Sequence, residues 1–370
     1  MRRPDTVVLD VTEQCNLKCV MCYFSGVDRL RFAPYDRSLS ERGTMPVEVF
    51  EKIAAEHFPR ARRVALACAA EPMIHPRFRD ILEIAGRYRV PDLWFPTNLL
   101  PLTPKTARAI VAAGVSTVAA SIDGVTREIY EKIRIGGKWD RLISRLDLLN
   151  EVKKEHRGKK PRLRIIFTWM RSNRHQLRRL PAFAAEYGAT ELDVRFVTPT
   201  TGVDVGPELL DGEDPDGLRA DLRATAEEAV ARGLKLASYP EFEVAAERPR
   251  TLVGRARRRL FNIRSGLERW ERWQHLWRER RNGCAYPGQT WVIRPNGAVS
   301  PCIFWQGDPI GFQPEDDLAA VARGQALRRI RDGLRDGEPI GTCTDCIHRR
   351  DAFYRPLRKS LPKLLRPETP

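Results

Sequence analysis

Apolar runs alternate with amphipathic stretches along the first 235 residues, and this alternation predicts repeated units of strand, loop and helix. Each short apolar run has the length of a buried strand, and a polar connection then leads to a stretch with helical periodicity. The predicted strands cover residues 6–12, 64–70, 92–97, 117–123, 163–170 and 192–197. The predicted helices begin near residue 46 and cover residues 76–89, 104–113, 129–150, 175–187 and 218–232.

Regular repetition of these units is typical of a parallel sheet with outer helices. Six curled units would close part of a barrel, so the predicted fold class is α/β, with a partial (β/α)6 TIM-like barrel. Catalytic groups of such barrels lie at the carboxyl ends of the strands. We expect the loop after the first strand to lie at that edge, together with Glu71, Asn98 and Asp123.

A different pattern begins at Cys284. Residues 291–300 read as two strands around Asn296-Gly297, which predicts a β-hairpin with a type I′ turn, and a helix over 318–334 then leads to a C-x-x-C pair. We therefore expect an α+β domain at the C-terminal end. The predicted parts are the barrel (1–235), a basic helical linker (236–283), the C-terminal domain (284–350) and a basic tail (351–370).

The chain is strongly basic. It has 64 Lys and Arg against 48 Asp and Glu, a formal net charge of +16, which favours phosphates, carboxylates, nucleic acid or anionic lipid as partners. The arginine-rich segment 248–281 fits a basic amphipathic helix that binds such a partner, or a bridging helix that packs its tryptophans between two domains. No signal peptide or apolar run long enough to span a membrane is present, so a soluble, cytoplasmic protein is expected.

The most informative motif is the trio Cys15, Cys19 and Cys22, which follows the first predicted strand. A cubane iron–sulfur cluster has four irons that each want a thiolate, so three cysteines on one loop can hold three irons and leave the fourth open. The alternatives are a structural zinc loop or three unrelated core thiols. Zinc usually takes four protein ligands in a structural site, and this loop has no fourth Cys or His.

The last four cysteines form a second constellation, Cys284, Cys302, Cys343 and Cys346, spread over the hairpin and the loop after the next helix. Four thiolates could hold zinc or a fully ligated iron–sulfur cluster, and their spacing does not choose between the two. The eighth cysteine, Cys68, stands alone. Cysteines in metal-ligand spacing are expected to stay thiols in a reducing compartment.

On the three-cysteine loop the chain resembles the radical S-adenosylmethionine (SAM) superfamily, whose signature follows the first barrel strand with these gaps. The resemblance implies that the three cysteines bind a [4Fe-4S] cluster, that SAM chelates the open iron, and that the reduced cluster cleaves SAM to a 5′-deoxyadenosyl radical. It further implies SAM contacts at strand ends and in the loop. These residues are Met21, Ala70, Glu71, Asn98 and Ser121.

The C-terminal cysteines are similar in order to those of the SPASM and twitch extensions, which bind auxiliary [4Fe-4S] clusters. The full SPASM pattern has seven cysteines, and four here look closer to the single-cluster twitch type. Four thiolates leave no iron free, so the resemblance implies electron transfer or structural support, and with it an oxidation assisted by the auxiliary cluster. An external electron donor such as flavodoxin or ferredoxin would complete the system.

The substrate and the catalytic residue stay unassigned. The chain starts almost on its first strand, without the leader-binding extension common in peptide-modifying relatives, which mildly favours an anionic small molecule over a peptide. Arg195 could reach a substrate anion or be only a charged strand end, and Asp123 and Arg134 could contact the cofactor, cap a helix or pair with each other. The alternative function is a nucleic-acid or membrane-surface binding protein with a structural zinc site at the C-terminal cysteines.

Overall fold

The computed structural model describes residues 6–22, 43–67, 70–156, 160–197, 203–238, 284, 286–287, 290–305, 307–344 and 346. Three features singled out in the sequence lie outside the described residues. They are Cys68, the segment 248–281 and the tail 351–370.

A ten-stranded sheet forms the framework, in the order β12-β11-β10-β1-β3-β4-β5-β7-β8-β9. From β1 to β9 every neighbouring pair is parallel. This part comprises β1 (Thr6–Leu9), β3 (Arg63–Ala65), β4 (Asp92–Thr97), β5 (Thr117–Ser121), β7 (Arg162–Trp169), β8 (Glu191–Phe196) and β9 (Lys235–Ser238). The six predicted strands are confirmed, and β9 adds a parallel strand that the sequence analysis did not predict.

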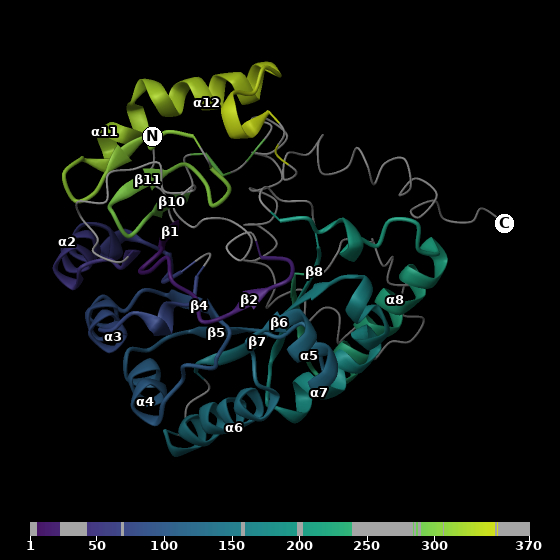
Figure 1. Cartoon of the computed structure of the whole chain (residues 1–370). Coiled ribbons are helices and arrows are strands. Elements are labelled where there is room, and N and C mark those ends of the chain that lie inside the picture. The colour runs from purple at the N-terminus through teal and green to yellow at the C-terminus, as the bar shows by residue number, and fades with distance from the viewer. Residues whose placement is uncertain are drawn as a thin grey trace, which may run out of the picture.

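Helices cover the outer side of the curved sheet (Figure 1). They are α2 (Val47–His57), α3 (Phe78–Arg87), α4 (Pro104–Ala112), α6 (Trp139–Glu155), α7 (Leu180–Glu186) and α8 (Pro215–Ala231). In α3 the buried residues Phe78, Ile81, Leu82 and Ala85 recur at helical spacing, as expected for one apolar face against the sheet. Short 3₁₀ turns occupy Phe58–Arg60, Pro72–Ile74, Arg171–Arg179, Gly206–Glu208 and Gly341–Cys343. No helix within the described ranges is long and apolar enough to cross a membrane.

Three segments that were each predicted as one continuous helix are divided in the structure, so these predictions were wrong. The helix predicted over 129–150 is broken into α5 (Arg127–Ile133) and α6 by the short strand β6 (Arg134–Ile135). Gly136 has φ +90° there, and a Cβ on Gly137 would lie 2.7 Å from the Arg134 carbonyl oxygen, so the two glycines permit a tight reversal. The helix predicted over 175–187 begins as a 3₁₀ turn, and that over 318–334 is divided at Gly324 into α11 (Leu318–Arg323) and α12 (Gln325–Asp336).

The C-terminal hairpin continues the barrel sheet. Strand β10 (Thr290–Ile293) pairs in parallel with β1, with Thr6 opposite Thr290, and antiparallel with β11 (Ala298–Ser300), which pairs with β12 (Gly311–Phe312). The predicted hairpin is confirmed, but its type I′ turn is wrong because only Gly297 has a positive φ, of +83°. Helices α11 and α12 lie over this end of the sheet (Figure 1).

Candidate active site

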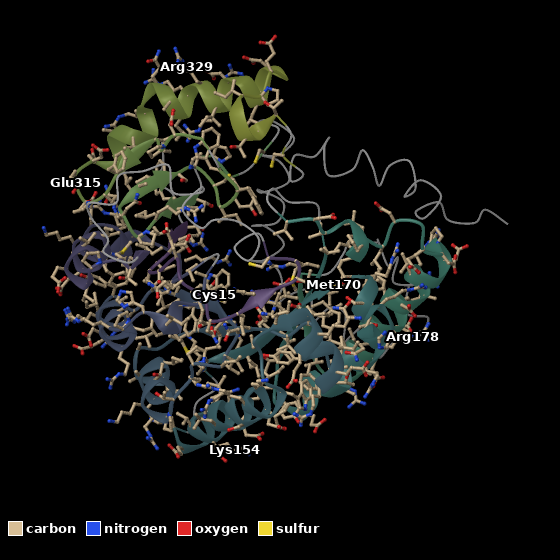
Figure 2. All side chains as sticks on the ribbon, viewed as in Figure 1. Cys15, Lys154, Met170, Arg178, Glu315 and Arg329 are labelled. Atoms are coloured by element: carbon tan, nitrogen blue, oxygen red, sulfur yellow. The ribbon has the colours of Figure 1, made fainter. Side chains whose placement is uncertain are left out.

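The cysteine loop leaves the carboxyl end of β1 and is pinned by a second, two-stranded sheet. In that sheet β2 (Lys18–Cys19) pairs antiparallel with β6, placing Cys19 opposite Arg134. The Cys22 N–H donates to the Cys19 carbonyl at 3.1 Å, and the Leu17 N–H lies 3.5 Å from Cys15 Sγ. Cys15 lies near the middle of the molecule, as Figure 2 shows. The loop therefore fixes the three cysteines relative to one another, with Cys19 buried and Cys15 and Cys22 partly buried.

The three thiols are close enough to act on one another electrostatically. Burial, with a smaller contribution from the neighbouring cysteines, raises the pKa of Cys15 above its ordinary value and the pKa of Cys19 to about 12. A buried thiol with such a pKa keeps its proton at neutral pH unless a positive centre takes the proton's place. The environment of these thiols suits replacement of protons by metal, with release of the protons to solvent.

Glu71 is buried beside the loop and joins two strand ends. Its backbone N–H donates to the Gln14 carbonyl at 3.0 Å, next to Cys15. Its carboxylate accepts hydrogen bonds from the Asn98 N–H at 2.6 Å, the Thr97 hydroxyl at 2.8 Å and the Met73 N–H at 3.2 Å. Burial raises the pKa of Glu71 to about 7, against the opposing effect of these donors.

Asn98 connects the end of β4 to the cysteine loop. Its side-chain amide donates to Asn16 Oδ1 at 2.8 Å and lies 4.0 Å from Cys15 Sγ, and its Oδ1 accepts from the Leu100 N–H at 3.0 Å. The same edge of the sheet carries Ser121 at the end of β5. The structure therefore brings Glu71 and Asn98 to the cysteine loop as expected.

Two other expected contacts with SAM lie in or beside the same region. Met21 is partly buried on the loop and packs near a small apolar cluster that includes Met170 and Val20. Ala70 is partly buried and directly precedes Glu71. Cys15 and Met170 both lie near the middle of the molecule in Figure 2.

Arg134 and Asp123 pair with each other, which is one of the alternatives left open above. Arg134 Nη2 lies 2.6 Å from Asp123 Oδ2, and their side chains are 9% and 0% exposed. Arg134 Nη1 also lies 3.8 Å from Cys19 Sγ. Burial opposes the charge on Arg134, but the Asp123 carboxylate and the Cys19 sulfur leave its pKa above the ordinary value.

The region fits an iron–sulfur cluster and its cofactor. Besides the three thiols, two buried polar atoms, Tyr130 Oη and Arg134 Nε, have no hydrogen-bond partner among the described residues. Buried polar groups in native proteins are nearly always paired, so orphaned atoms beside a thiol loop are consistent with an additional group there. The donor set, with soft sulfur ligands from one loop, suits iron.

The four C-terminal cysteines are also brought together. Burial raises the pKa of Cys302 to about 12, and Cys343, Cys284 and Cys346 are near enough to contribute to this rise. Cys343 packs against Ile330 and Leu334 of α12, so helix and cysteine loop share one small core. The hairpin, helix and final loop thus assemble a second sulfur site.

Neither site is arranged around a single ion. Among the side chains that the structure describes, no three of His, Cys, Asp and Glu converge closely enough to hold one metal ion. A cluster differs in this respect, because each thiolate binds a different iron.

Arg195, a candidate for an anionic substrate, is held on its own strand. Its Nε and Nη2 donate to the two carboxylate oxygens of Asp193 at 2.8 and 2.6 Å. The side chain is still 52% exposed, whereas that of Asp193 is 3% exposed. Arg195 therefore presents an oriented, half-exposed guanidinium, paired with Asp193, at the carboxyl end of β8.

Comparison with known proteins matches the two cysteine sets to two families. Residues 9–159 match the radical SAM superfamily, and residues 284–347 match the SPASM iron–sulfur cluster-binding domain. The chain therefore contains a radical SAM domain and, at its C-terminal end, a SPASM-type domain. Members of this superfamily are enzymes, and domains of these two kinds bind SAM and iron–sulfur clusters.

Two curated relatives illustrate the range of the superfamily. The chain is 27% identical over 210 residues to a "Tungsten-containing aldehyde ferredoxin oxidoreductase cofactor-modifying protein" of Pyrococcus furiosus, covering 55% of this chain and 54% of the relative. It is 27% identical over 206 residues to mycofactocin maturase MftC of Mycobacterium tuberculosis, covering 56% and 48%. The chain thus spans about half the length of these relatives.

A solved structure supports the architecture. Streptococcus suis SuiB bound to S-adenosylmethionine superposes with a TM-score of 0.61 at 17% identity, covering 90% of this chain and 67% of SuiB. At this identity the likeness concerns the fold alone. The fold is shared over both the barrel and the C-terminal domain.

Some residues of the site were not predicted. Thr97 and Asn16 were not singled out, although both contact predicted residues, and their positions beside Asn98 and Cys15 in the sequence were the available signal. Tyr130 was not singled out either. Its burial beside Arg134 depends on the break between α5 and α6, which the helical periodicity concealed.

Proposed function

We propose that Cys15, Cys19 and Cys22 hold a [4Fe-4S] cluster through three irons, and that SAM binds the fourth. The carrying observation is the placement of three interacting thiols on one interior loop at the carboxyl edge of a parallel barrel sheet. When bound, the reduced cluster and SAM supply a 5′-deoxyadenosyl radical that removes hydrogen from a substrate carbon. The protein contributes positioning and exclusion of water.

The residues around the loop have distinct roles in this proposal. Ser121 and Asn98 present polar side chains toward the cofactor from the ends of β5 and β4, and Met21 shields it with an apolar side chain. Ala70 leaves room for the cofactor to approach the backbone. The Glu71 carboxylate is occupied by three protein donors, so it acts by fixing the strand end that carries Asn98.

The C-terminal cysteines, in this proposal, bind one auxiliary [4Fe-4S] cluster. Cys284, Cys302, Cys343 and Cys346 occupy all four irons, which leaves electron transfer or structural support as its role. An electron acceptor beside the barrel makes a net oxidation of the substrate possible. An external donor such as flavodoxin or ferredoxin would supply the reducing electron, and the seven cysteines of the described residues, present as thiols, suit a reducing, cytoplasmic location.

The substrate class is a peptide or a small molecule that carries an anionic group. Arg195 supports this choice because it exposes its guanidinium at the carboxyl end of β8, on the edge where the cysteine loop begins. The named relatives include a mycofactocin maturase and a cofactor-modifying protein, and SuiB has been solved bound to its precursor peptide SuiA. The substrate's reacting carbon would lie at this edge.

Formation of 5′-deoxyadenosine tests the proposal. Protein purified without oxygen is mixed with SAM and dithionite, and the nucleoside products are measured by chromatography and mass spectrometry. We expect 5′-deoxyadenosine from the wild type and none from Cys19→Ala. Lys18→Ala is the matched control, because it changes an exposed neighbour on β2 and should retain cleavage. Equal cleavage by Cys19→Ala and the wild type would refute the assignment of the loop.

A further inference from the structure

Arg134 meets Cys19 through both its backbone and its side chain. The backbones of the two residues face each other across the β2–β6 pair, and the neighbouring Val20 N–H donates to the Ile133 carbonyl at 3.0 Å. From this position the guanidinium reaches back, with Nη1 3.8 Å from Cys19 Sγ. Arg127, at the start of the preceding helix α5, pairs instead with Asp140 at the protein surface.

The guanidinium is held in place from the other side. Arg134 Nη2 lies 2.6 Å from Asp123 Oδ2, and Asp123 Oδ1 accepts from the Thr168 N–H of β7 at 2.7 Å. The Asn173 side chain donates to the Asp123 carbonyl at 2.9 Å. Asp123 is therefore fixed by two elements of the barrel. The Arg134 guanidinium lies between the Asp123 carboxylate and the Cys19 sulfur.

We infer that Arg134 sets the reduction potential of the cluster bound by Cys19, and that Asp123 limits the size of this effect. The inference rests on the proposed cluster assignment. Hydrogen bonds and positive charge at a ligating sulfur withdraw electron density from the cluster and stabilise its reduced form, and buried surroundings strengthen the effect. The Asp123 carboxylate partly cancels the field of the guanidinium at the sulfur.

Substitutions at Arg134 and Asp123 should shift the reduction potential in opposite directions, and this difference tests the inference. Arg134→Met removes the donor and the charge, so the cluster becomes harder to reduce. Asp123→Asn keeps the hydrogen-bonding shape but removes the compensating negative charge, so the cluster becomes easier to reduce. A purely structural role would not produce shifts of opposite sign. Arg134→Lys retains the charge and should lie between Arg134→Met and the wild type.

The measurement is a redox titration monitored by electron paramagnetic resonance on the reconstituted full chain without SAM. The N-terminal cluster is identified as the signal that changes when SAM is added afterwards. At the wild-type midpoint we expect the reduced-to-oxidised ratio to fall about tenfold in Arg134→Met, a shift of about 59 mV for one electron. Asp123→Asn should shift the midpoint in the positive direction, and Arg127→Gln, the matched control, should leave it unchanged.

The outcomes separate the two claims. A wild-type midpoint in both Arg134→Met and Asp123→Asn, or shifts of the same sign, would overturn the role of Arg134 while leaving the cluster assignment intact. If Arg134→Met does not retain iron, the sign of the Asp123→Asn shift decides. A wild type without any SAM-sensitive signal would overturn the proposed function, and the inference with it.

Discussion

The Glu71 carboxylate accepts a hydrogen bond of 2.6 Å from the backbone N–H of Asn98, which joins the loop after β3 to the end of β4. The same carboxylate accepts from Thr97 and Met73, and the Glu71 N–H donates next to Cys15. One buried side chain therefore fixes two strand ends and the cysteine loop relative to each other. A carboxylate in this position makes the site sensitive to pH.

Replacing Glu71 by Gln should change how stability depends on pH. Burial raises the pKa of Glu71 to about 7 in the folded protein, above its value in the unfolded chain. Its contribution is fully present below the unfolded pKa and is lost as pH rises through about 7. Between about pH 5.5 and about pH 8 the wild type should lose about 2 kcal/mol of unfolding free energy relative to Glu71→Gln.

Denaturant unfolding without SAM, at several pH values, measures this difference. Glu83→Gln, an exposed position on α3, is the control and should follow the wild-type profile. Parallel pH profiles for the wild type and Glu71→Gln would show that the carboxyl titrates outside this window.

A buried ion pair fastens the hairpin to the barrel. Arg294 Nη1 lies 2.5 Å from Asp10 Oδ2, and the two side chains are 17% and 3% exposed. Arg294→Met leaves the carboxylate without its charged partner and should cost about 3 kcal/mol in unfolding free energy. The double variant with Asp10→Asn should cost less than the sum of the single changes, because the two side chains contact each other directly.

A double-mutant cycle by denaturant unfolding measures that coupling. The exposed pair of Arg335 and Asp336 on α12 is the control. Substitutions that remove this ion pair should leave the unfolding free energy near the wild-type value. Simple additivity of the Asp10 and Arg294 changes would mean that the pair does not join the two parts of the sheet.

Gly297 is required where the hairpin meets β12. A Cβ at this position would lie 2.1 Å from the Gln313 carbonyl oxygen, and its φ is +83°. Gly297→Ala should therefore displace the hairpin that carries Cys302 and lower the iron content toward that of one cluster, about four of about eight irons per chain. Gly212→Ala is matched, with φ +82° and nothing within 4 Å, so it should cost about 1 kcal/mol and keep the iron.

Iron analysis of the two purified glycine variants checks this prediction. Equal iron in Gly297→Ala and Gly212→Ala would show that the close approach to Gln313 does not control the C-terminal site.

Local sequence signals predicted the elements that place the site. The apolar runs located six parallel strands, because buried parallel strands are nearly continuous apolar segments. The glycine of Asn296-Gly297 located the hairpin, although the turn uses one positive φ rather than two. Both cysteine sets were predicted as sites, and the structure brings the members of each set together.

Contacts between distant segments could not be predicted in the same way. The helical periodicity of 129–150 hid the reversal at Gly136 and Gly137, and that reversal is what places Arg134 opposite Cys19. The parallel pairing of β10 with β1 joins segments more than 280 residues apart and has no local signal. The contact of Arg134 with Cys19 Sγ depends on the tertiary fold in the same way.

Iron content and the response to SAM test the central claim most directly. Iron per chain and electron paramagnetic resonance spectra, recorded with and without SAM, are compared for the wild type and the triple variant Cys15→Ala, Cys19→Ala, Cys22→Ala. We predict that the triple variant loses about half of the iron and the whole SAM-dependent spectral change. Full iron content in that variant, or an unaltered response to SAM, would contradict the account.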